Sequence, residues 1–402
     1  MNLSTKILIA LALGIVAGLE LGAEGAAFAK TWIAPLGTIF MNLIKMVIVP
    51  LVFSSLVMGV CGLGDVKKLG RSGIKTVGLY LVTTAFAIAL GIGLGVLVQP
   101  GVGLNLSTEG LQAAAKTAPP IMKVIIDIFP SNPLQALVKA NMLQIIVFSL
   151  FVGVGIVSVG EKAEALKATI NGLAEVSYKM VAMIMSVAPI GVFGLIAPVV
   201  AVNGPAVLLP LLKVVIAVYV GCLLHALVVY GGLIKFFGNG NPVEFFKGIF
   251  PASLMAFSSC SSGGTLPLTM DCLRKMGISK SISSFVIPLG ATINMDGTAV
   301  YQGVCALFVA QIYGVDLTAG QYMTIMLTGT LASIGTAGVP GAGFIMLTMI
   351  LTSLGLPLEG SALIAGIDRI LDMPRTSVNV TGDGAVCCIV DKSERNGEEV
   401  DA

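Results

Sequence analysis

A polar stripe lies near the C-terminus of a very apolar chain, in the segment GIDRILDMPRTSVNVTGD at residues 366–383. The aspartate carboxylates of this segment can bind an ammonium group or a metal cation, and its arginine guanidinium groups can bind a carboxylate. A charged residue at the centre of a membrane helix costs about 2.5 to 3.5 kcal/mol, so an unpaired stripe would cost on the order of 10 kcal/mol or more. We therefore expect neutralising partners. At about 100° per residue, a helix places six polar side chains of this segment within roughly 100° of one another, and Arg369 lies at the margin of that face. The six residues are Asp368, Asp372, Arg375, Thr376, Asn379 and Asp383.

Asp372 and Arg375 stand about one turn apart with opposite charge, so an ion pair within the helix is the simplest interpretation. A buried ion pair is usually no more stabilising than apolar residues of similar size, which favours an interpretation in which each group addresses a ligand. An amino acid with an acidic side chain presents an ammonium to Asp372 and a distal carboxylate to Arg375, and arginine suits bidentate carboxylate recognition. We expect Asp368 and Arg369 to form a supporting pair.

A cluster of small residues at 261–264 has the composition of an anion site. Ser261, Ser262, Gly263 and Gly264 would expose backbone N–H groups at the start of a helix, where the helix dipole also favours negative charge. Close helix packing explains an isolated cluster of this kind equally well. A second cluster of small residues further along the chain, again beside a helix with polar residues, favours a binding site for an α-carboxylate.

Hard oxygen ligands are concentrated in the segment GATINMDG at 290–297. The segment supplies a carboxylate, an amide, a hydroxyl and a glycine that can free backbone carbonyls, all of which suit a dehydrated alkali cation. Asn379 and Asp383 form a second set. A third set consists of Thr83 and Thr84 with Tyr80 about one turn earlier, although this set alone is more typical of a helix-packing surface.

The composition of the chain is that of a polytopic membrane protein. Its 402 residues are 56% hydrophobic and 11% charged, with a mean hydropathy of +0.98, far from the averages of soluble domains. A net charge of +2, with no basic run beside aromatic residues, argues against a nucleic-acid partner. The seven cysteines have no metal-ligand spacing and are expected to be reduced, and His225 is expected to pack within a helix.

Six apolar runs are long enough to span about 30 Å of hydrocarbon: 5–22, 33–63, 74–98, 142–160, 172–201 and 204–236. Basic residues follow the second and fourth runs, among them Lys67, Lys68, Lys162 and Lys167. The positive-inside rule then predicts that both termini lie in the cytoplasm and that the polar connection at 99–141 lies outside the cell.

The apolar pattern beyond residue 236 is interrupted by serine, glycine and proline. Residues 242–276 contain SSCSSGGTLPL between two short apolar arms, and residues 318–354 repeat that plan around SIGTAGVPGAG. Each is predicted to be a helical hairpin that enters the membrane and returns, the first from the cytoplasm and the second from outside. Each is followed by a spanning helix with a predicted polar break, at 294–298 and 379–383, which makes an inverted repeat typical of secondary transporters.

The chain resembles the glutamate transporter family, the dicarboxylate/amino acid:cation symporters, in four motifs that occur in the expected order: SSCSSGGTLP, NMDGTAVYQG, SIGTAGVPGAG and DRILDMPRTSVNVTGD. The resemblance covers essentially the whole chain. It implies a prokaryotic symporter that takes aspartate and/or glutamate into the cell with sodium, and not an enzyme. It also implies an all-α polytopic fold of eight transmembrane helices and two re-entrant hairpins, assembled as a homotrimer in the cell membrane.

The same resemblance implies two domains, a scaffold and a mobile transport domain that moves like an elevator. The scaffold would comprise residues 1–73 and 100–201, the latter carrying the trimer contacts. The transport domain would comprise 74–99 and 202–392, and residues 393–402 would form a polar tail.

By motif, the resemblance implies a substrate site in which Asp372 binds the ammonium and Arg375 the side-chain carboxylate. Further substrate contacts are implied for Ser261, Ser262, Thr298, Gly338, Thr376 and Asn379. Sodium is implied at more than one site. The ligands of the first set are Asn294, Asn379 and Asp383. Those of the second set are Thr83, Thr84, Asn294 and Asp296, with Tyr80 about one turn earlier as a further metal residue. The third set would be Thr292 with backbone groups around Ser333, Ile334 and Thr336. Gly290 and Met295 are further metal-binding candidates.

Two departures from the family pattern bear on the site. Some prokaryotic members have an arginine at the first hairpin tip, where this chain has Cys260, whereas Arg369 resembles the pattern of many animal members. We expect the Arg369 guanidinium to reach the same place from another helix. Gln302 stands where proton-coupled members have glutamate, which favours sodium coupling without an obligatory proton.

Four other functions fit the residues less well. A carrier for neutral amino acids such as serine, alanine or threonine is opposed by Arg375, and a C4-dicarboxylate:cation symporter would leave Asp372 without an ammonium. An intramembrane hydrolase would need a base beside Ser261 or Ser262, and His225 lies in another segment. A passive anion channel would not need two opposed hairpins acting as gates, whereas a transporter that works by alternating access would.

Overall fold

The computed structural model describes residues 3–66, 71–104, 126, 129–238, 240–334, 336, 338 and 341–401. These residues form helices joined by turns, with no strand among them, so the described part of the chain is all-α as predicted. Residues 105–125 of the predicted outer connection, and the basic residues Lys67 and Lys68, lie outside the described part.

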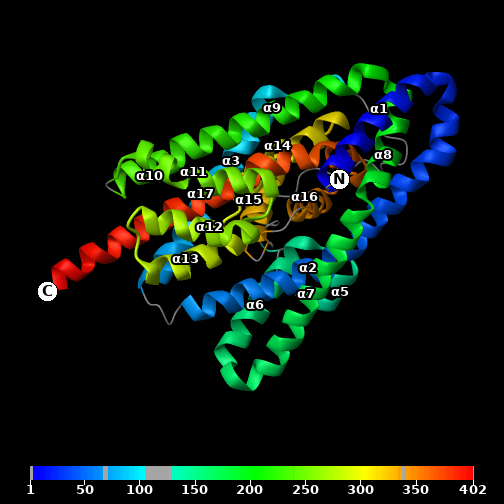
Figure 1. Cartoon of the computed structure of the whole chain (residues 1–402). Coiled ribbons are helices and arrows are strands. Elements are labelled where there is room, and N and C mark those ends of the chain that lie inside the picture. The colour runs from blue at the N-terminus through cyan, green and yellow to red at the C-terminus, as the bar shows by residue number, and fades with distance from the viewer. Residues whose placement is uncertain are drawn as a thin grey trace.

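The first half of the chain forms long apolar helices (Figure 1). Four stretches of the described residues are long and apolar enough to cross a membrane: Thr5–Gly62, Ser72–Val98, Leu143–Ser186 and Gly204–Phe236. The helices of this half are α1 (Leu3–Phe28), η1 (Ala29–Ile33), α2 (Ala34–Val66), α3 (Arg71–Val98), α5 (Pro133–Val138), α6 (Met142–Val159), η3 (Gly160–Ala163), α7 (Glu164–Ser186) and α8 (Ala188–Asn203).

The predicted apolar run at 172–201 is not one continuous helix. It is interrupted at Val187, between α7 and α8, where Val187 has φ −95° and ψ 0°. Pro189 stands in the first turn of α8, a position that proline tolerates because its missing N–H would have no partner there. The run therefore forms parts of two helices, α7 and α8.

Apart from α17, which has 41 residues, the helices of the second half of the chain have 18 residues or fewer. The helices of this half are η4 (Gly204–Val207), α9 (Leu208–Leu224), η5 (His225–Tyr230), α10 (Gly231–Phe236), α11 (Pro242–Ser259), α12 (Ser262–Lys275), α13 (Lys280–Ile293), α14 (Asp296–Ile312), α15 (Ala319–Ser333), α16 (Ala342–Ser353), η6 (Leu358–Gly360) and α17 (Ser361–Asp401).

A pair of packed helices stands at each of the two positions where a hairpin is predicted. α11 packs on α12, and α15 packs on α16. Local sequence sets their starts: the Asn241 side chain accepts a hydrogen bond from the N–H of Val243, and Thr318 forms a capping box with Gln321. The first hairpin turns at Cys260, which has a left-handed backbone with φ 54°.

Only one of the two predicted helix breaks is found. The break between α13 and α14 falls at Asn294 and Met295, as predicted, whereas α17 continues as a helix through 379–383. α17 packs against α11, α13 and α14, and this packing can offset the roughly 1 kcal/mol that a glycine such as Gly382 costs a helix. The Thr381 hydroxyl also bonds back into its own helix. The predicted second break is therefore wrong.

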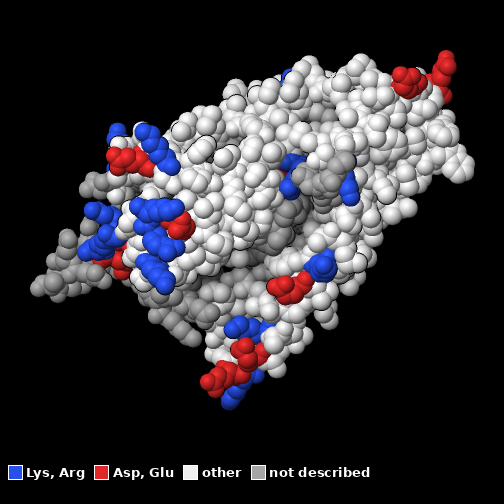
Figure 2. Space-filling view, viewed as in Figure 1, with Lys and Arg blue, Asp and Glu red and all other residues white. Residues whose placement is uncertain are grey.

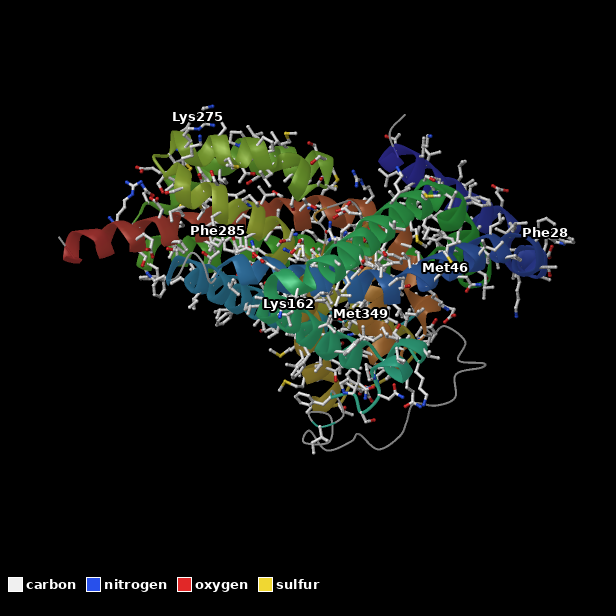
Figure 3. The ribbon with its side chains drawn as sticks, turned by 90° about the horizontal axis from the view of Figure 1, so that it is seen from below. Phe28, Met46, Lys162, Lys275, Phe285 and Met349 are labelled. Carbon is white, nitrogen blue, oxygen red and sulfur yellow. The ribbon has the colours of Figure 1, made fainter. Side chains whose placement is uncertain are left out.

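α14 lies in the core of the molecule, between α3, α9 and α17 (Figure 1). Every residue of α14 except Gln311 is buried. The exterior carries large apolar side chains such as Trp32 and Phe151, which are 70% and 67% exposed, as expected for a surface that faces lipid. In Figure 2 many of the charged side chains gather at the ends of the molecule, and the surface between these ends is mostly uncharged, with a few charged side chains near its middle. Figure 3 shows Lys275 and Phe28 at opposite ends of that length.

Candidate functional site

The tips of the two hairpins meet. The N–H of Gly263 and the hydroxyl of Ser261 both donate to the carbonyl of Gly338, at 3.3 and 3.0 Å. A Cβ atom at Gly338 would lie 3.0 Å from both the Ala291 carbonyl oxygen and the Ser262 Cβ, so the close approach of the tips favours glycine at this position. The structure thus brings Ser261, Ser262 and Gly338 together, as the sequence predicts.

The first tip is closed by protein groups. The N–H of Gly264 bonds to the Ser261 hydroxyl at 3.0 Å, and the N–H of Gly263 is held by Gly338. Ser262, the first residue of α12, is only 3% exposed. A carboxylate bound at this tip would therefore take the place of the Gly338 carbonyl, so entry of an anion requires the two hairpin tips to separate.

Arg375 lies fully buried between two carboxylates. Its Nη1 donates to Asp368 Oδ1 at 2.9 Å, and its Nη2 lies 2.9 Å from Asp372 Oδ1. The guanidinium carbon stands 4.0 Å above the ring centre of Tyr301, a cation–π arrangement. Nε has no hydrogen bond among the described residues, and the Nη2 contact is not aligned as one. A buried guanidinium with spare donors fits a ligand that carries a carboxylate.

The predicted pairing of Asp368 with Arg369 is not the pairing found. Asp368 pairs with Arg375, two turns away, while Arg369 Nη1 lies 3.8 Å from Asp372 Oδ2. The reason is geometric, because adjacent residues of a helix do not face each other. Arg369 Nη2 also donates to the Ser259 carbonyl at 3.1 Å, so its guanidinium reaches the tip of the first hairpin from α17, as predicted.

Asp372 faces both the second hairpin and its own helix. Its Oδ1 accepts a hydrogen bond from the Thr376 hydroxyl at 3.2 Å, and its Oδ2 lies 3.4 Å from the N–H of Gly341 at the start of α16. Movement of the second hairpin would therefore change the surroundings of this carboxylate.

Asn379 connects the polar stripe to the break before α14. Its Oδ1 accepts from the N–H of Gly297 at 2.8 Å, and its Nδ2 lies 3.4 Å from Thr298 Oγ1 and 3.3 Å from Met295 Sδ. The orphaned N–H groups of the α14 N-terminus thus meet an amide oxygen from α17. The predicted substrate residues Thr298, Thr376 and Asn379 lie together in this part of the structure.

The first predicted cation set is assembled. Asn294 Nδ2 donates to the Asn379 carbonyl at 3.0 Å and to Asp383 Oδ1 at 2.9 Å, whereas the buried Asn294 Oδ1 has no hydrogen bond among the described residues. A Cβ atom at Gly290 would lie 2.4 Å from Asp383 Oδ1 and 2.5 Å from the Tyr80 hydroxyl. An orphaned amide oxygen beside a buried carboxylate fits a cation ligand set.

The second predicted set is assembled in part. The Thr84 hydroxyl donates to Asp296 Oδ1 at 2.6 Å. Thr83 instead donates to the Tyr80 carbonyl within α3 at 3.1 Å, and the Tyr80 hydroxyl donates to the Val286 carbonyl at 3.1 Å. The core of this set is therefore Asp296 and Thr84.

The third predicted set is not joined by hydrogen bonds among the described residues. Thr292 is exposed and donates to a carbonyl of its own helix. Ser333 and Thr336 likewise bond within α15 and the turn that follows it, beside Ile334. A site that uses both Thr292 and the end of α15 remains a prediction.

Two residues that belong to none of the predicted cation sets contact Asp296. His225 Nε2 lies 3.1 Å from Asp296 Oδ2, and the Tyr230 hydroxyl donates to the same oxygen at 2.7 Å. The prediction that His225 packs within a helix is confirmed, but the residue also has a polar partner in the core. No spacing in the sequence signals these contacts, since more than 60 positions separate each residue from Asp296.

A family model described as the sodium:dicarboxylate symporter family matches residues 3–393 of this chain. The chain belongs to this family. The family expected from the four motifs is thereby confirmed, and it is a family of symporters and not of enzymes.

Relatives in this family align along nearly their full length. The chain is 39% identical over 401 residues to the proton/sodium-glutamate symport protein of Geobacillus stearothermophilus, covering 98% of this chain and 94% of the relative. It is 39% identical over 412 residues to the proton/glutamate-aspartate symporter of Escherichia coli strain K12, covering 98% and 93%. It is 35% identical over 410 residues to the C4-dicarboxylate transport protein of Bacillus subtilis strain 168, covering 99% and 95%.

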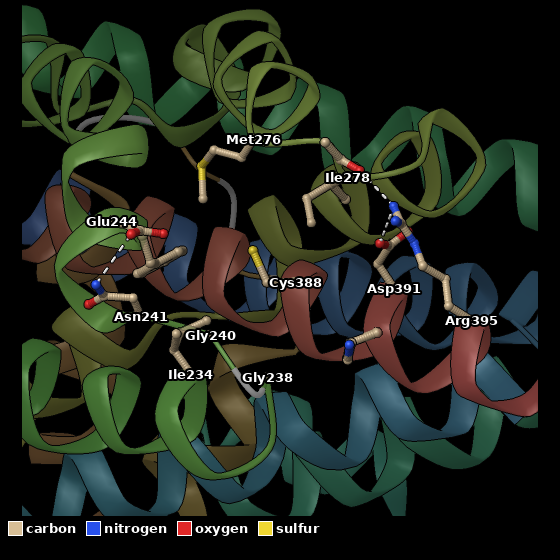
Figure 4. Close-up of a pocket in the computed structure, with 13 residues that line it drawn as sticks. Ile234, Gly238, Gly240, Asn241, Glu244, Met276, Ile278, Cys388, Asp391 and Arg395 are labelled. Atoms are coloured by element: carbon tan, nitrogen blue, oxygen red, sulfur yellow. Dashed lines mark hydrogen bonds and ion pairs between the residues drawn. The ribbon is translucent and has the colours of Figure 1, made fainter.

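A cavity of about 430 Å³ lies apart from these residues, at the far end of α17 (Figure 4). Its wall includes Cys388, Met276 and Arg395. Asp391 lies at the edge of the cavity. Its Oδ1 accepts a hydrogen bond from the N–H of Ser279 at 3.1 Å, and its Oδ2 forms an ion pair with Arg395 Nη2 at 2.8 Å. The carboxylate thus ties α17 to the start of α13, which is a structural role.

Gly297→Ala tests the close contact of α14 with α17. A Cβ atom at this position would lie 2.3 Å from the Arg375 carbonyl oxygen, so the two helices must move apart. Overpacking of this kind costs about 1 to 3 kcal/mol, and we expect a lower unfolding temperature and weaker aspartate binding. Calorimetric titration measures the binding, and thermal unfolding measures the stability.

Gly93→Ala on α3, where a Cβ atom would meet nothing within 4 Å, is the matched control and should bind aspartate as the wild type does. Equal binding by both variants would contradict the helix contact.

Proposed function

We propose that this family member is a secondary transporter that carries acidic L-amino acids, aspartate and/or glutamate, into the cell together with sodium. The observation that carries the proposal is the fully buried Arg375, which keeps spare donors beside the meeting point of two hairpins. Relatives named as glutamate and glutamate-aspartate symporters support the substrate class.

Substrate recognition follows from the charges at the site. The side-chain carboxylate of the substrate would pair with Arg375, and its ammonium would lie against Asp372, which already faces two arginines. The α-carboxylate would bind between Ser262 and the Gly338 backbone, where the tips now bond to each other. Binding and closure of the second hairpin are thereby linked, because Gly341 contacts Asp372.

The buried carboxylates support coupling to sodium. Asp296 and Asp383 are 0% and 2% exposed, and an uncompensated charge at such depth is costly. Bound sodium would cancel this charge, so that the loaded site can close and move. Some relatives carry "proton" in their names, but the buried Gln302, which by the family resemblance stands where proton-coupled members have glutamate, has no acid group to carry a proton. We infer coupling to sodium, at more than one site, without an obligatory proton.

The proposed architecture is that of an elevator. Eight spanning helices and two re-entrant hairpins, with both termini in the cytoplasm, would divide into a scaffold (1–73 and 100–201) and a transport domain (74–99 and 202–392). The packing supports this division, since α2 packs mainly on α6, α7 and α8, while α14 packs mainly on α3, α17 and α9. Three copies of the scaffold would form the homotrimer.

A C4-dicarboxylate carrier is the second candidate, because one relative with that name is 35% identical to this chain. Such a substrate would satisfy Arg375 but would offer nothing to Asp372. A carrier for neutral amino acids would leave Arg375 without a substrate carboxylate.

Uptake into proteoliposomes tests the proposed function. Labelled aspartate is expected to accumulate when a sodium gradient points inward, and glutamate is expected to compete with it better than serine or succinate does. Replacing external sodium with potassium is the control and should abolish accumulation. Accumulation that is independent of the sodium gradient would overturn sodium coupling, and stronger competition by succinate or serine would overturn the substrate assignment.

A further inference from the structure

The carboxylate of Asp296 is held by three side chains from two other helical segments. Its Oδ1 accepts from the Thr84 hydroxyl at 2.6 Å on α3. Its Oδ2 accepts from the Tyr230 hydroxyl at 2.7 Å and lies 3.1 Å from His225 Nε2, both on η5. All four side chains are fully buried, so each of these contacts is made away from water. Hydrogen bonds to a charged group in such surroundings are stronger than neutral ones.

The unusual helical geometry of η5 makes the double contact possible. His225 and Tyr230 are the first and last residues of a π-helical turn. In an α-helix, residues five apart point about 140° away from each other, at about 100° per residue. In a π-helix, residue i+5 lies one turn above residue i, so the two side chains can converge. Their rings are indeed in edge-to-face contact, with centroids 4.9 Å apart.

The two oxygens of Asp296 therefore have different surroundings. Oδ2 is anchored by η5, whereas Oδ1 faces Thr84, a residue of the predicted cation set. His225 must present its Nε2–H to the carboxylate, since two acceptors would repel each other at 3.1 Å. With Oδ2 fixed by two donors, the carboxylate cannot rotate freely, and Oδ1 stays aimed at Thr84.

We propose that His225 and Tyr230 are positioning residues of the cation site at Asp296, and that the π-helical turn exists to supply both. They hold the carboxylate in one orientation, so that a sodium ion bound by Oδ1 and Thr84 meets a ready-made geometry. This inference rests on the proposed function, because it assigns a role within the sodium site. Residues that orient metal ligands in this way typically change metal affinity by about 10- to 100-fold when they are mutated.

Three variants test the inference: His225→Leu, His225→Gln and Tyr230→Phe. Leucine removes the donor, glutamine retains an N–H near the position of Nε2, and phenylalanine removes only a hydroxyl. We expect His225→Leu and Tyr230→Phe to raise the sodium concentration for half-maximal aspartate binding by roughly tenfold or more. His225→Gln should retain much of the sodium affinity that His225→Leu loses. Aspartate affinity at saturating sodium should stay near that of the wild type.

Sodium-dependent thermal unfolding separates positioning from general stability. A structural role would lower the unfolding temperature equally with and without sodium, whereas a positioning role reduces the rise in unfolding temperature that sodium produces. Tyr219→Phe is the matched control, because its hydroxyl on α9 donates to the Ile370 carbonyl at 3.1 Å, and its sodium response should be unchanged.

The outcomes distinguish this inference from the proposed function. A wild-type protein that binds aspartate without sodium would overturn the proposed function and with it the inference. A sodium-dependent wild type whose Tyr230→Phe variant keeps the same half-maximal sodium concentration and the same sodium-induced stabilisation would overturn the inference alone. Tyr230→Phe is nearly isosteric, so the test holds even where His225→Leu fails to fold.

Discussion

Arg375→Gln is expected to abolish high-affinity binding of aspartate and glutamate while sparing any weak binding of neutral amino acids. The guanidinium is the fully buried cation between Asp368 and Asp372, so its loss removes the partner of the substrate's second carboxylate. Removing one partner of a buried, hydrogen-bonded charge pair costs about 2 to 5 kcal/mol. In affinity this is a loss of roughly 30-fold or more for aspartate. Calorimetric titration with aspartate and serine in saturating sodium measures the change.

The controls separate loss of recognition from loss of folding. Arg375→Gln leaves Asp368 without its ion-pair partner. The double variant Asp368→Asn, Arg375→Gln replaces that ion pair by two amides, and Asp372 retains its ion pair with Arg369. The double variant should regain stability and still fail to bind aspartate. Arg274→Gln, at an exposed pair with Asp271, should bind as the wild type does. If either Arg375 variant retained wild-type aspartate affinity, the assigned role of this guanidinium would be wrong.

The hairpin boundaries could be predicted because they are encoded locally. Asn241 before Pro242, and Thr318 three residues before Gln321, are capping patterns that start a helix whatever packs around it. The break at Asn294 was equally accessible, because an amide at Asn294 and an acid at Asp296, two positions apart in an apolar run, indicate a polar interruption of the helix. Local chemistry therefore determined where the two hairpins begin and where α14 starts.

The second break could not be judged from the sequence alone. The segments at 294–298 and 379–383 have similar compositions, yet only the first interrupts its helix. The difference depends on what packs around each segment: Asn379 from the intact α17 caps the N–H of Gly297 at the start of α14. One polar segment stays helical and thereby satisfies the broken end of the other, which is a long-range effect.

The pairing of charges along α17 shows the same limit. The helical wheel correctly placed Asp368, Asp372 and Arg375 on one face, but the choice of partner depends on side-chain reach and on neighbouring helices. Arg369 turns away from Asp368 because the Ser259 carbonyl is available to it on α11. The contacts of His225 and Tyr230 with Asp296 were missed for a related reason, since an α-helical periodicity places the two residues on different faces.

Asp383→Asn is expected to weaken sodium dependence and leave the choice of substrate unchanged. Asp383 is 2% exposed and accepts the Asn294 amide at 2.9 Å, about two turns along the helix from Arg375. Asparagine is nearly isosteric and can still accept this bond, so the main change is the loss of one negative charge at the cation site. Affinity at such oxygen sites depends on the number of charged ligands. We expect the sodium concentration for half-maximal aspartate binding to rise about tenfold or more, equivalent to about 1.4 kcal/mol.

Asp391→Asn on the same helix is the matched control for this prediction. Asp391 is also buried, at 3% exposure, but its carboxylate serves Ser279 and Arg395 far from the site. It should alter stability without shifting the sodium response. The ratio of aspartate to serine affinity should be the same in both variants and in the wild type, because Arg375 and Asp372 are untouched. An Asp383→Asn protein that changed this ratio and kept its sodium response would show that the two ends of the polar stripe do not divide substrate from cation as proposed.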